Sequence, residues 1–225
     1  MTEVPSLPDE TSHLADRLGR LYSGVVFDVM RSLGLDAGVL PPDLQALDPN
    51  LRLAGPAWTV RGSLVDAADA HETLLDWTRM LSRAPAGSVV VCEPNNDEIA
   101  LLGELSAQAL KMRGVRGYVV DGGCRDTQFI RELGFAVFCR FRTPRDIVGR
   151  WLTSELGGTV TIGAVRITTG DYLLGDQDGI VVIPGEHVVD VIDAAEAAAA
   201  VENKVRTAIL EGTEPEQAYV RYGKF

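Results

Sequence analysis

The chain opens with apolar residues at helical spacing, which predicts two short helices. Leucines recur every three or four positions after Ser12. A second stretch of this kind begins at Ser23, a candidate N-cap, and stops at Gly34. Residues 1–10 carry two prolines among acidic residues, so we expect a loose arm there. The two helices are expected to cover part of a sheet or a neighbouring subunit.

Apolar runs alternate with helical patterns through the middle of the chain. The predicted strands cover residues 57–61, 88–92, 117–121 and 136–139. The predicted helices between them cover residues 71–82, 98–113 and 127–133. Parallel strands need a crossover of about a dozen residues, so this alternation predicts an α/β layer.

The pattern changes after Gly157. Short alternating runs separated by glycine and Asp-Gly turns follow, which is typical of antiparallel strands. A long alanine-rich helix is predicted over residues 185–212. Because no linker, low-complexity tract or internal repeat divides the chain, we expect one domain of mixed α/β class over residues 1–225.

Composition and charge narrow the class of protein. Of the 225 residues, 46% are apolar and 24% are charged, which suits a globular protein with a sizeable core. The formal charge of −11 repels a phosphate backbone and no basic run offsets it, so nucleic acid is not an expected partner. No apolar run reaches the ~18 residues of a membrane span, and the first residues lack the pattern of a signal peptide. We therefore expect a cytoplasmic protein that has no membrane partner.

Cysteine and histidine offer little metal or disulfide chemistry. The cysteines lie in or beside apolar runs and are expected to be reduced thiols; they are Cys92, Cys124 and Cys139. The histidines lack metal-site spacing; they are His13, His71 and His187. Cys124 is either an activated thiolate beside an arginine or a small residue packed beneath a turn.

A glycine pair follows the predicted strand at residues 117–121 and leads into an Arg-Asp pair. Ligands of α/β layers bind beyond the carboxyl ends of strands, and Gly122 and Gly123 would let the backbone approach such a ligand. Arg125 can grip a carboxylate with two parallel hydrogen bonds, and Asp126 offers a hard oxygen to Mg²⁺ or Mn²⁺. Equally, Asp126 is a good N-cap for the next helix and Arg125 suits a surface turn.

These residues belong to a longer stretch that resembles a known family. Residues 103–146 read GELSAQALKMRGVRGYVVDGGCRDTQFIRELGFAVFCRFRTPRD and resemble the RraA-like family, which includes class II pyruvate aldolases. Further similar stretches are GPAWTVRG upstream, and GDYLLGDQDGIVVIP and AAAAVENKVRTAILEG downstream. The resemblance therefore covers nearly the whole chain.

Within this family, the chain is more similar to the aldolases than to the ribonuclease regulators. The aldolase pattern is an acidic residue, twenty residues, and then Arg-Asp; Glu104 stands at that spacing before Arg125, where those aldolases typically have Asp. The regulator pattern has glycine at the first position and an acidic residue three after the Asp. Here Glu104 and Phe129 occupy those positions, which favours an enzyme over a regulator.

The resemblance also implies roles for individual residues. Asp126 would bind the divalent metal and Arg125 the substrate, and Glu104 would hold metal-bound water or transfer a proton. Glu202, in the last helix, would reach a neighbouring subunit's site. The backbone that would hold the substrate carboxylate belongs to Gly103, Glu104, Leu105 and Ser106.

Each of these assignments has a plainer alternative. Gly103 suits a packing site, or the true start of a helix that the pattern places too early. Glu104 and Glu202 suit solvated helix faces. Three arginines can receive a distal carboxylate or be ordinary surface charges; they are Arg140, Arg142 and Arg145.

The function implied by the resemblance is retro-aldol cleavage of a 4-hydroxy-2-oxo acid, dependent on Mg²⁺ or Mn²⁺ and releasing pyruvate. Substrates of that class are 4-hydroxy-4-methyl-2-oxoglutarate and 4-carboxy-4-hydroxy-2-oxoadipate. Decarboxylation of oxaloacetate gives the same enolate and is an expected side activity. The implied fold is an α-β-β-α sandwich in homotrimers or hexamers. The alternative function is a regulator without enzymatic activity that binds a ribonuclease.

Overall fold

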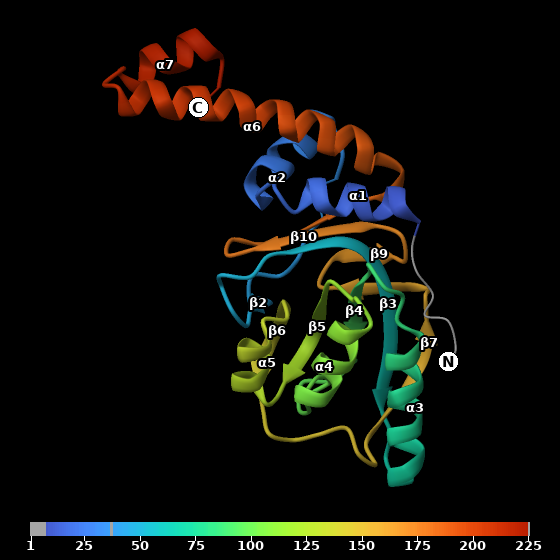
Figure 1. Cartoon of the computed structure of the whole chain (residues 1–225). Coiled ribbons are helices and arrows are strands. Elements are labelled where there is room, and N and C mark those ends of the chain that lie inside the picture. Colours follow the sequence, from blue (N-terminus) through green and yellow to red (C-terminus); the bar gives the residue numbers. More distant parts are fainter. Residues whose placement is uncertain (1–7, 37, 225) are drawn as a thin grey trace.

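One long strand joins two halves of a curled sheet. The computed structural model describes residues 8–36 and 38–224, and β3 (Leu53–Leu64) belongs to both halves. Its first residues pair with β10 (Tyr172–Asp176), and the following ones pair with β4 (Val89–Glu93). Because β3 bends along its length, one hydrogen-bonded sheet forms two β layers (Figure 1).

The first half of the sheet is mainly parallel. β3, β4, β5 (Gly117–Cys124) and β6 (Val137–Arg142) pair in that order, with antiparallel β7 (Trp151–Leu156) on β3 and β2 (Gln45–Ala46) on β6. The connections between the parallel strands carry α3 (Ala70–Arg83), α4 (Glu104–Met112) and α5 (Thr127–Leu133). The predicted α/β layer is confirmed.

The second half is antiparallel. β10 pairs with β11 (Gly179–Ile183), and β11 pairs with β1 (Gly38–Val39). A separate hairpin consists of β8 (Thr159–Ile162) and β9 (Val165–Thr168). The change of pattern after Gly157 therefore marks antiparallel strands, as predicted.

Helices from both ends of the chain cover the antiparallel half. α1 (Asp9–Leu18), α2 (Ser23–Ser32) and α6 (Val188–Leu210) pack on β10 and β11 through one buried apolar cluster. A 3₁₀ turn at Gly185–His187 leads into α6, and α7 (Pro215–Tyr222) follows it. A second cluster lies between the parallel half and α3, α4 and α5, and a third fills the space between the two β layers. The layer order is α-β-β-α, so the predicted fold class is confirmed.

Three details of the predicted elements are wrong. Residues 98–103 are not helical, and α4 begins only at Glu104. Ser23 does not cap α2; its amide and hydroxyl both donate to the buried carboxylate of Asp176, at 2.8 and 2.7 Å. Asp9 and the following residue belong to α1, while residues 1–7 of the predicted arm lie outside the described residues.

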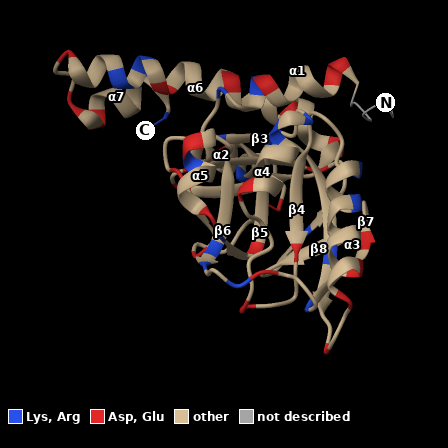
Figure 2. Ribbon diagram, turned by 60° about the horizontal axis from the view of Figure 1, so that its bottom comes forward, with Lys and Arg blue, Asp and Glu red and all other residues tan. Residues whose placement is uncertain are grey.

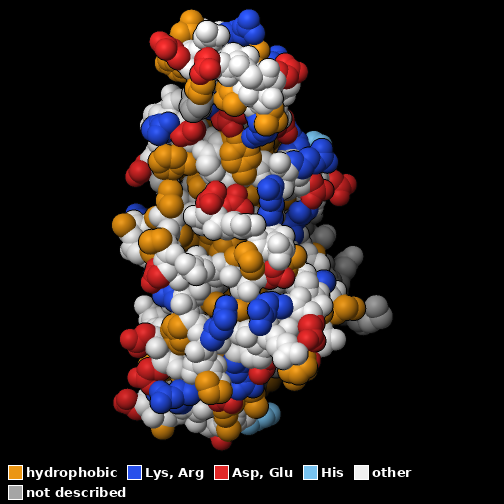
Figure 3. Space-filling model, turned by 90° about the vertical axis from the view of Figure 1, so that its left-hand side faces the viewer, with side chains coloured by type: hydrophobic (Ala, Val, Ile, Leu, Met, Phe, Trp, Pro, Cys, Tyr) orange, Lys and Arg blue, Asp and Glu red, His pale blue; other side chains and the backbone are white. Residues whose placement is uncertain are grey.

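The far end of α6 projects from the body of the molecule together with α7 (Figure 1). α7 is folded back along α6 (Figure 2). Apolar side chains are exposed on this arm, as the top of Figure 3 shows, and they include Leu210, Tyr219 and Val220. Of the helices in residues 8–36 and 38–224, none combines the length and apolar character that a membrane crossing requires.

Candidate functional site

The glycine pair lies inside β5 and makes room for other parts of the chain. A Cβ on Gly122 would come within 2.9 Å of the Pro94 ring, and one on Gly123 within 2.5 Å of the Phe141 ring and 2.8 Å of the Ile99 carbonyl oxygen. The expectation that these glycines admit a ligand to the backbone is therefore wrong. They make room for the segment that leads into α4 and for the Phe141 ring of β6.

That segment runs beside the end of β5 like a short extra strand. Ala100 forms a parallel bridge with Gly123, and the Leu101 amide donates to the Gly123 carbonyl oxygen at 2.9 Å. The Arg125 amide then donates to the Leu102 carbonyl oxygen, also at 2.9 Å. Residues 98–103 use their hydrogen bonds in this way instead of forming a helix, and they bring the start of α4 to the Arg-Asp pair.

Asp126 occupies a strained position and caps a helix other than the one that it precedes. Its backbone is left-handed, with φ 52° and ψ 34°, and its side chain makes no capping hydrogen bond to α5. Oδ2 instead accepts a hydrogen bond, at 3.2 Å, from the amide of Glu104, the first residue of α4. Aspartate tolerates left-handed backbone better than most residues, and such strain gathers at functional sites.

Gly103 allows this contact to form. Its backbone is extended, but a Cβ there would lie 2.7 Å from Asp126 Oδ2 and 3.1 Å from Arg125 Nε. The alternative that Gly103 is a packing site at a helix start is confirmed. The packing is against the two candidate functional side chains.

Arg125 lies between two carboxylates. Its Nε is 3.4 Å from Asp126 Oδ2, and its Nη1 is 3.3 Å from Asp146 Oδ2. All three side chains are between 36% and 48% exposed, so these ion pairs contribute little to stability. They orient the guanidinium instead. Asp146 is in turn held by the Val148 amide, which donates to its Oδ1 at 3.1 Å.

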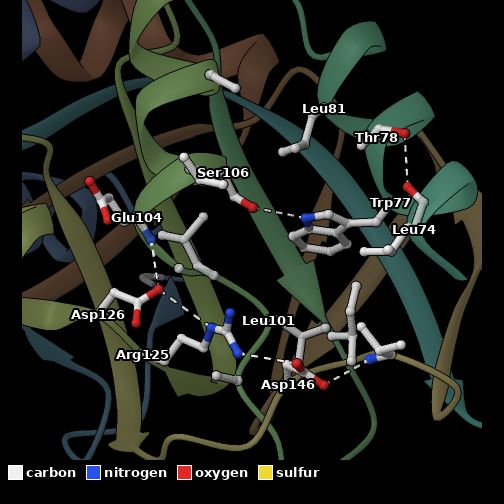
Figure 4. A pocket seen from close by; sticks show the side chains of 17 residues that line it. Leu74, Trp77, Thr78, Leu81, Leu101, Glu104, Ser106, Arg125, Asp126 and Asp146 are labelled. Carbon is white, nitrogen blue, oxygen red and sulfur yellow. Dashed lines mark hydrogen bonds and ion pairs between the residues drawn. The ribbon is translucent and has the colours of Figure 1, made fainter. Parts of the chain in front are cut away.

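The Arg-Asp pair lies at one end of a cavity of about 540 Å³ (Figure 4). This volume suits a small organic ligand. α3, the start of α4, the end of β5 and residues 146–148 form its walls. Trp77 Nε1 donates to Ser106 Oγ at 2.9 Å and ties α3 to α4 across the cavity. The lining includes the four residues predicted to hold a carboxylate through their backbone: Gly103, Glu104, Leu105 and Ser106.

The backbone of residues 103–106 is better placed to bind a ligand than the side chains of these residues are. The first hydrogen bond inside α4 is donated by Ala107 to the Gly103 carbonyl oxygen, so the amides of Leu105 and Ser106 precede it. Such amides favour an anion. The Leu105 side chain is 78% exposed, and the Glu104 carboxylate points away from Arg125 in Figure 4.

Glu202 is not part of this site in its own chain. It lies on α6, where Lys224 Nζ is 2.9 Å from its Oε1. It borders a separate groove between α2 and α6, beside Val205 and Ile209. Its side chain is 20% exposed, so it is not a fully solvated charge.

Two of the three candidate distal arginines are in ion pairs elsewhere. Arg140 contacts Asp43 and Asp121, and Arg145 Nη1 is 3.8 Å from Glu98. Arg142 is exposed and borders a shallower depression of about 320 Å³ on another side of Arg125 and Asp126. None of these arginines lines the larger cavity.

The thiols and imidazoles take no part in the cavity. All three cysteines are buried and free, as predicted. A hydrogen bond with Cys139 and burial both raise the pKa of the Cys124 thiol above its ordinary value, which favours the packing role over an activated thiolate. No histidine lines the cavity.

Sequence patterns gave no sign of two important lining residues. Asp146 is 21 positions after Arg125, and Trp77 is 29 positions before Ser106. Asp146 ends the stretch RTPRD, in which a turn-forming acid is common. Trp77 fits an ordinary core position of an amphipathic helix. Only the packing of α3 and of residues 146–148 around α4 gives them a place at the site.

The donor set suits a divalent cation that keeps much of its water. In the described ranges 8–36 and 38–224, His, Cys, Asp and Glu form no cluster of three that would hold a metal. Asp126 Oδ2 is used by the Glu104 amide, while Oδ1 accepts no hydrogen bond from any described residue. One hard carboxylate oxygen completed by water and substrate oxygens is a common arrangement for Mg²⁺.

Comparison with known proteins identifies a family. Residues 11–182 match the RraA-like family, described as Aldolase/RraA. The chain is 29% identical to a "Putative 4-hydroxy-4-methyl-2-oxoglutarate aldolase" of Halalkalibacterium halodurans, over 80% of this chain and 83% of that protein. The resemblance inferred from residues 103–146 is therefore confirmed at the level of the family.

Two other relatives have different names. The crystal structure of Streptomyces coelicolor RraAS2, described as an unusual member of the RNase ES inhibitor RraA protein family, superposes with a TM-score of 0.77 at 26% identity, over 89% of this chain and 99% of that one. Protein DlpA of Legionella pneumophila is 25% identical over 95% of this chain, which spans only 34% of the length of DlpA.

We expect Gly103→Ala to disturb the site and leave the fold intact. The new Cβ would displace the Asp126 carboxylate and the flexible Arg125 side chain, whose Nε and Cγ lie 3.1 and 3.2 Å away, and it would meet no backbone atom within that distance, so the melting temperature should change little. The Glu104 amide should lose its acceptor and exchange its hydrogen at least several times faster, measured by NMR.

Gly24→Ala is the matched control, because a Cβ there meets only the Tyr22 ring at 3.7 Å. It should leave exchange at Glu104 unchanged. Equal exchange at Glu104 in both variants would show that Gly103 does not maintain this contact.

Proposed function

Since the chain belongs to the RraA-like family, Aldolase/RraA, we propose that it is a divalent-metal-dependent lyase that releases pyruvate from a 4-hydroxy-2-oxo acid. One observation carries the proposal: Arg125, Asp126 and the start of α4 converge at one end of a cavity of about 540 Å³. A 2-oxo acid has an anionic carboxylate beside a polarisable keto oxygen. This end of the cavity offers complementary groups for both.

Asp126 is the proposed metal ligand, since no described residue donates a hydrogen bond to its Oδ1 and its Oδ2 accepts one from the Glu104 amide. When bound, Mg²⁺ or Mn²⁺ would supply Lewis acidity at the keto oxygen of the substrate. The capping of α4 by Asp126 is compatible with this role, because a carboxylate has lone pairs for both partners.

Arg125 is the proposed substrate-binding and catalytic residue. Its guanidinium can donate to the substrate carboxylate and to the keto oxygen, where negative charge develops during cleavage. Asp146 acts on it as a positioning residue through the contact at 3.3 Å. The amides of Leu105 and Ser106, at the positive end of α4, can complete the binding of the carboxylate.

The reaction needs a base, an electron sink and a later proton donor. The 4-hydroxyl loses its proton, the bond between C3 and C4 breaks, and its electron pair forms the enolate of pyruvate as C4 leaves as a carbonyl compound. Protonation at C3 then gives pyruvate. We assign the proton transfer to Glu104, which has to turn toward the cavity from its position in Figure 4. Loss of carbon dioxide from oxaloacetate would give the same enolate.

A regulator of a ribonuclease is the second candidate, because a similar structure is described as a member of an inhibitor family. Phe129, where the regulator pattern has an acidic residue, is 51% exposed on α5, which does not favour that function. Metal-dependent release of pyruvate from oxaloacetate separates the two candidates, since a regulator without enzymatic activity would lack it.

We further propose that the chain forms homotrimers or hexamers, in which Glu202 approaches a neighbour's site. The projecting arm supports this, because Leu210 and Val220 are 81% and 77% exposed and would be covered in an assembly. Light scattering at micromolar concentration is expected to give a multiple of three chains. The mass of a monomer would contradict the proposal.

Asp126→Asn should nearly abolish turnover without unfolding the protein. Asparagine still accepts a hydrogen bond from the Glu104 amide, so the melting temperature should stay close to that of the wild type. A neutral amide binds a hard cation weakly, so pyruvate release should fall by about a hundredfold or more.

Chelation tests the same assignment in the wild type. EDTA should abolish pyruvate release, and Mg²⁺ or Mn²⁺ should restore it. Asp66→Asn, at an exposed position outside the cavity, is the control and should keep full activity. Full activity in Asp126→Asn, or after exhaustive chelation, would rule out the metal site.

Arg125→Ala should lower kcat/KM about tenfold to a hundredfold, because a hydrogen bond to a charged group contributes about 1.5–3 kcal/mol. Arg125→Lys should recover only part of this, since an ammonium keeps the charge and loses the planar fork. Arg145→Ala removes an exposed arginine that does not line the cavity and should change kcat/KM little. Equal effects of the two alanine substitutions would contradict the role of Arg125.

A further inference from the structure

The cavity has a polar end and an apolar wall. Arg125, Asp126 and Asp146 lie at the polar end, and apolar side chains form the wall, which begins beside Asp146. The apolar wall consists of Leu74, Trp77, Leu81, Ala109, Ile147 and Val148. Its residues come from α3, from α4 and from the segment that follows Asp146; Figure 4 labels the three that α3 contributes, Leu74, Trp77 and Leu81.

Two side-chain donors of α3 on this side of the cavity are already engaged. Trp77 Nε1, the only polar side-chain atom of the apolar wall, donates to Ser106 Oγ at 2.9 Å. The neighbouring hydroxyl of Thr78 donates to the Leu74 carbonyl oxygen at 2.8 Å. A charged group on the far part of a substrate would therefore lose water here and gain at most the neutral Ser106 hydroxyl as a donor, with no cation beside it.

The charges that line the cavity also oppose a second anionic group. The guanidinium of Arg125 faces the carboxylates of Asp126 and Asp146, while the Glu104 carboxylate points away, so the charged groups that face the cavity sum to −1. A divalent cation at Asp126 would bring this charge to +1, which one substrate carboxylate neutralises. The first carboxylate of a substrate would then bind at Arg125, and a second would find no unpaired cation on the apolar wall.

We infer that the substrates are 4-hydroxy-2-oxo acids whose only carboxylate is the one beside the keto group and whose C4 substituent is apolar, either alkyl or aryl. This inference rests on the proposed function. The bond between C3 and C4 breaks as proposed above, so the products are pyruvate and an apolar aldehyde or ketone. Each methylene that the apolar wall buries should raise kcat/KM about fourfold.

The first test separates the chemistry from the choice of substrate. Pyruvate has only three carbons, so it does not contact the part of the site that holds a C4 substituent. The proposed site should still exchange the methyl protons of pyruvate for deuterium in D₂O containing Mg²⁺, and NMR detects this exchange. The same preparation is then assayed with 4-hydroxy-2-oxohexanoate, 4-hydroxy-2-oxo-4-phenylbutanoate and 4-hydroxy-2-oxoglutarate, in which the C4 substituents are ethyl, phenyl and carboxylate.

The two apolar compounds should exceed the dicarboxylate in kcat/KM by at least about tenfold. Exchange of the pyruvate protons together with preference for the dicarboxylate would overturn this inference alone. Absence of exchange would overturn the proposed function and the inference with it.

Two adjacent leucines of α3 provide a matched pair of variants. Leu74 and Leu75 are 48% and 38% exposed, but only Leu74 lines the cavity. Leu74→Lys places a cation on the apolar wall, so the ratio of kcat/KM for the dicarboxylate to that for the phenyl compound should rise at least about tenfold. Leu75→Lys adds the same charge outside the cavity and should leave the ratio unchanged.

Arg142 supplies the competing explanation, because it borders the depression on another side of Arg125 and Asp126. If the C4 substituent bound in this depression, the wild type would prefer the dicarboxylate, and Arg142→Ala would remove that preference. These two results would overturn the inference. Under our inference Arg142→Ala leaves the preference for apolar substituents intact.

Discussion

The candidate site depends on one contact between two segments that follow neighbouring strands. The carboxylate of Asp126, at the end of β5, accepts the first amide of α4, and Gly103 leaves just enough room for it. This contact fixes the start of α4 against the Arg-Asp pair and holds Asp126 in left-handed backbone. A helix N-terminus, a guanidinium and a carboxylate, which would be ordinary features apart, are thereby brought together at the site where we propose that an oxo acid binds.

Residues outside the site position the two segments that form the contact between Asp126 and the Glu104 amide. Pairing of residues 100–102 with the end of β5 requires glycine at position 123, because Phe141 and the Ile99 carbonyl oxygen occupy the space of a side chain. α3 packs across α4 through the hydrogen bond between Trp77 and Ser106 and closes the other side of the cavity. The polar end and the apolar wall are thus consequences of how one crossover helix begins and of what packs against it.

Much of the fold was predictable because the spacing of apolar residues along a helix or strand indicates which side of it is buried. The parallel strands, their crossover helices and the later antiparallel strands all follow from it. Residues 98–103 were wrongly predicted as helical because Ile99, Leu101 and Leu102 are all buried, so their spacing carries no sign of an exposed face. Their strand-like pairing with β5 is a tertiary effect that no local pattern reports.

The candidate site was predictable only in part. The Arg-Asp pair was singled out because ligands of α/β layers bind beyond the carboxyl ends of strands and because its stretch resembles the RraA-like family, whereas Asp146 and Trp77 look ordinary and join the site only through folding. The sharpest test of the site is calorimetric titration with oxalate, which resembles the enolate of pyruvate in shape and charge. We predict that oxalate binds in the presence of Mg²⁺, more tightly than pyruvate does, and that Asp126→Asn loses this binding. Equal binding with and without Mg²⁺, or no binding to the wild type, would contradict the account.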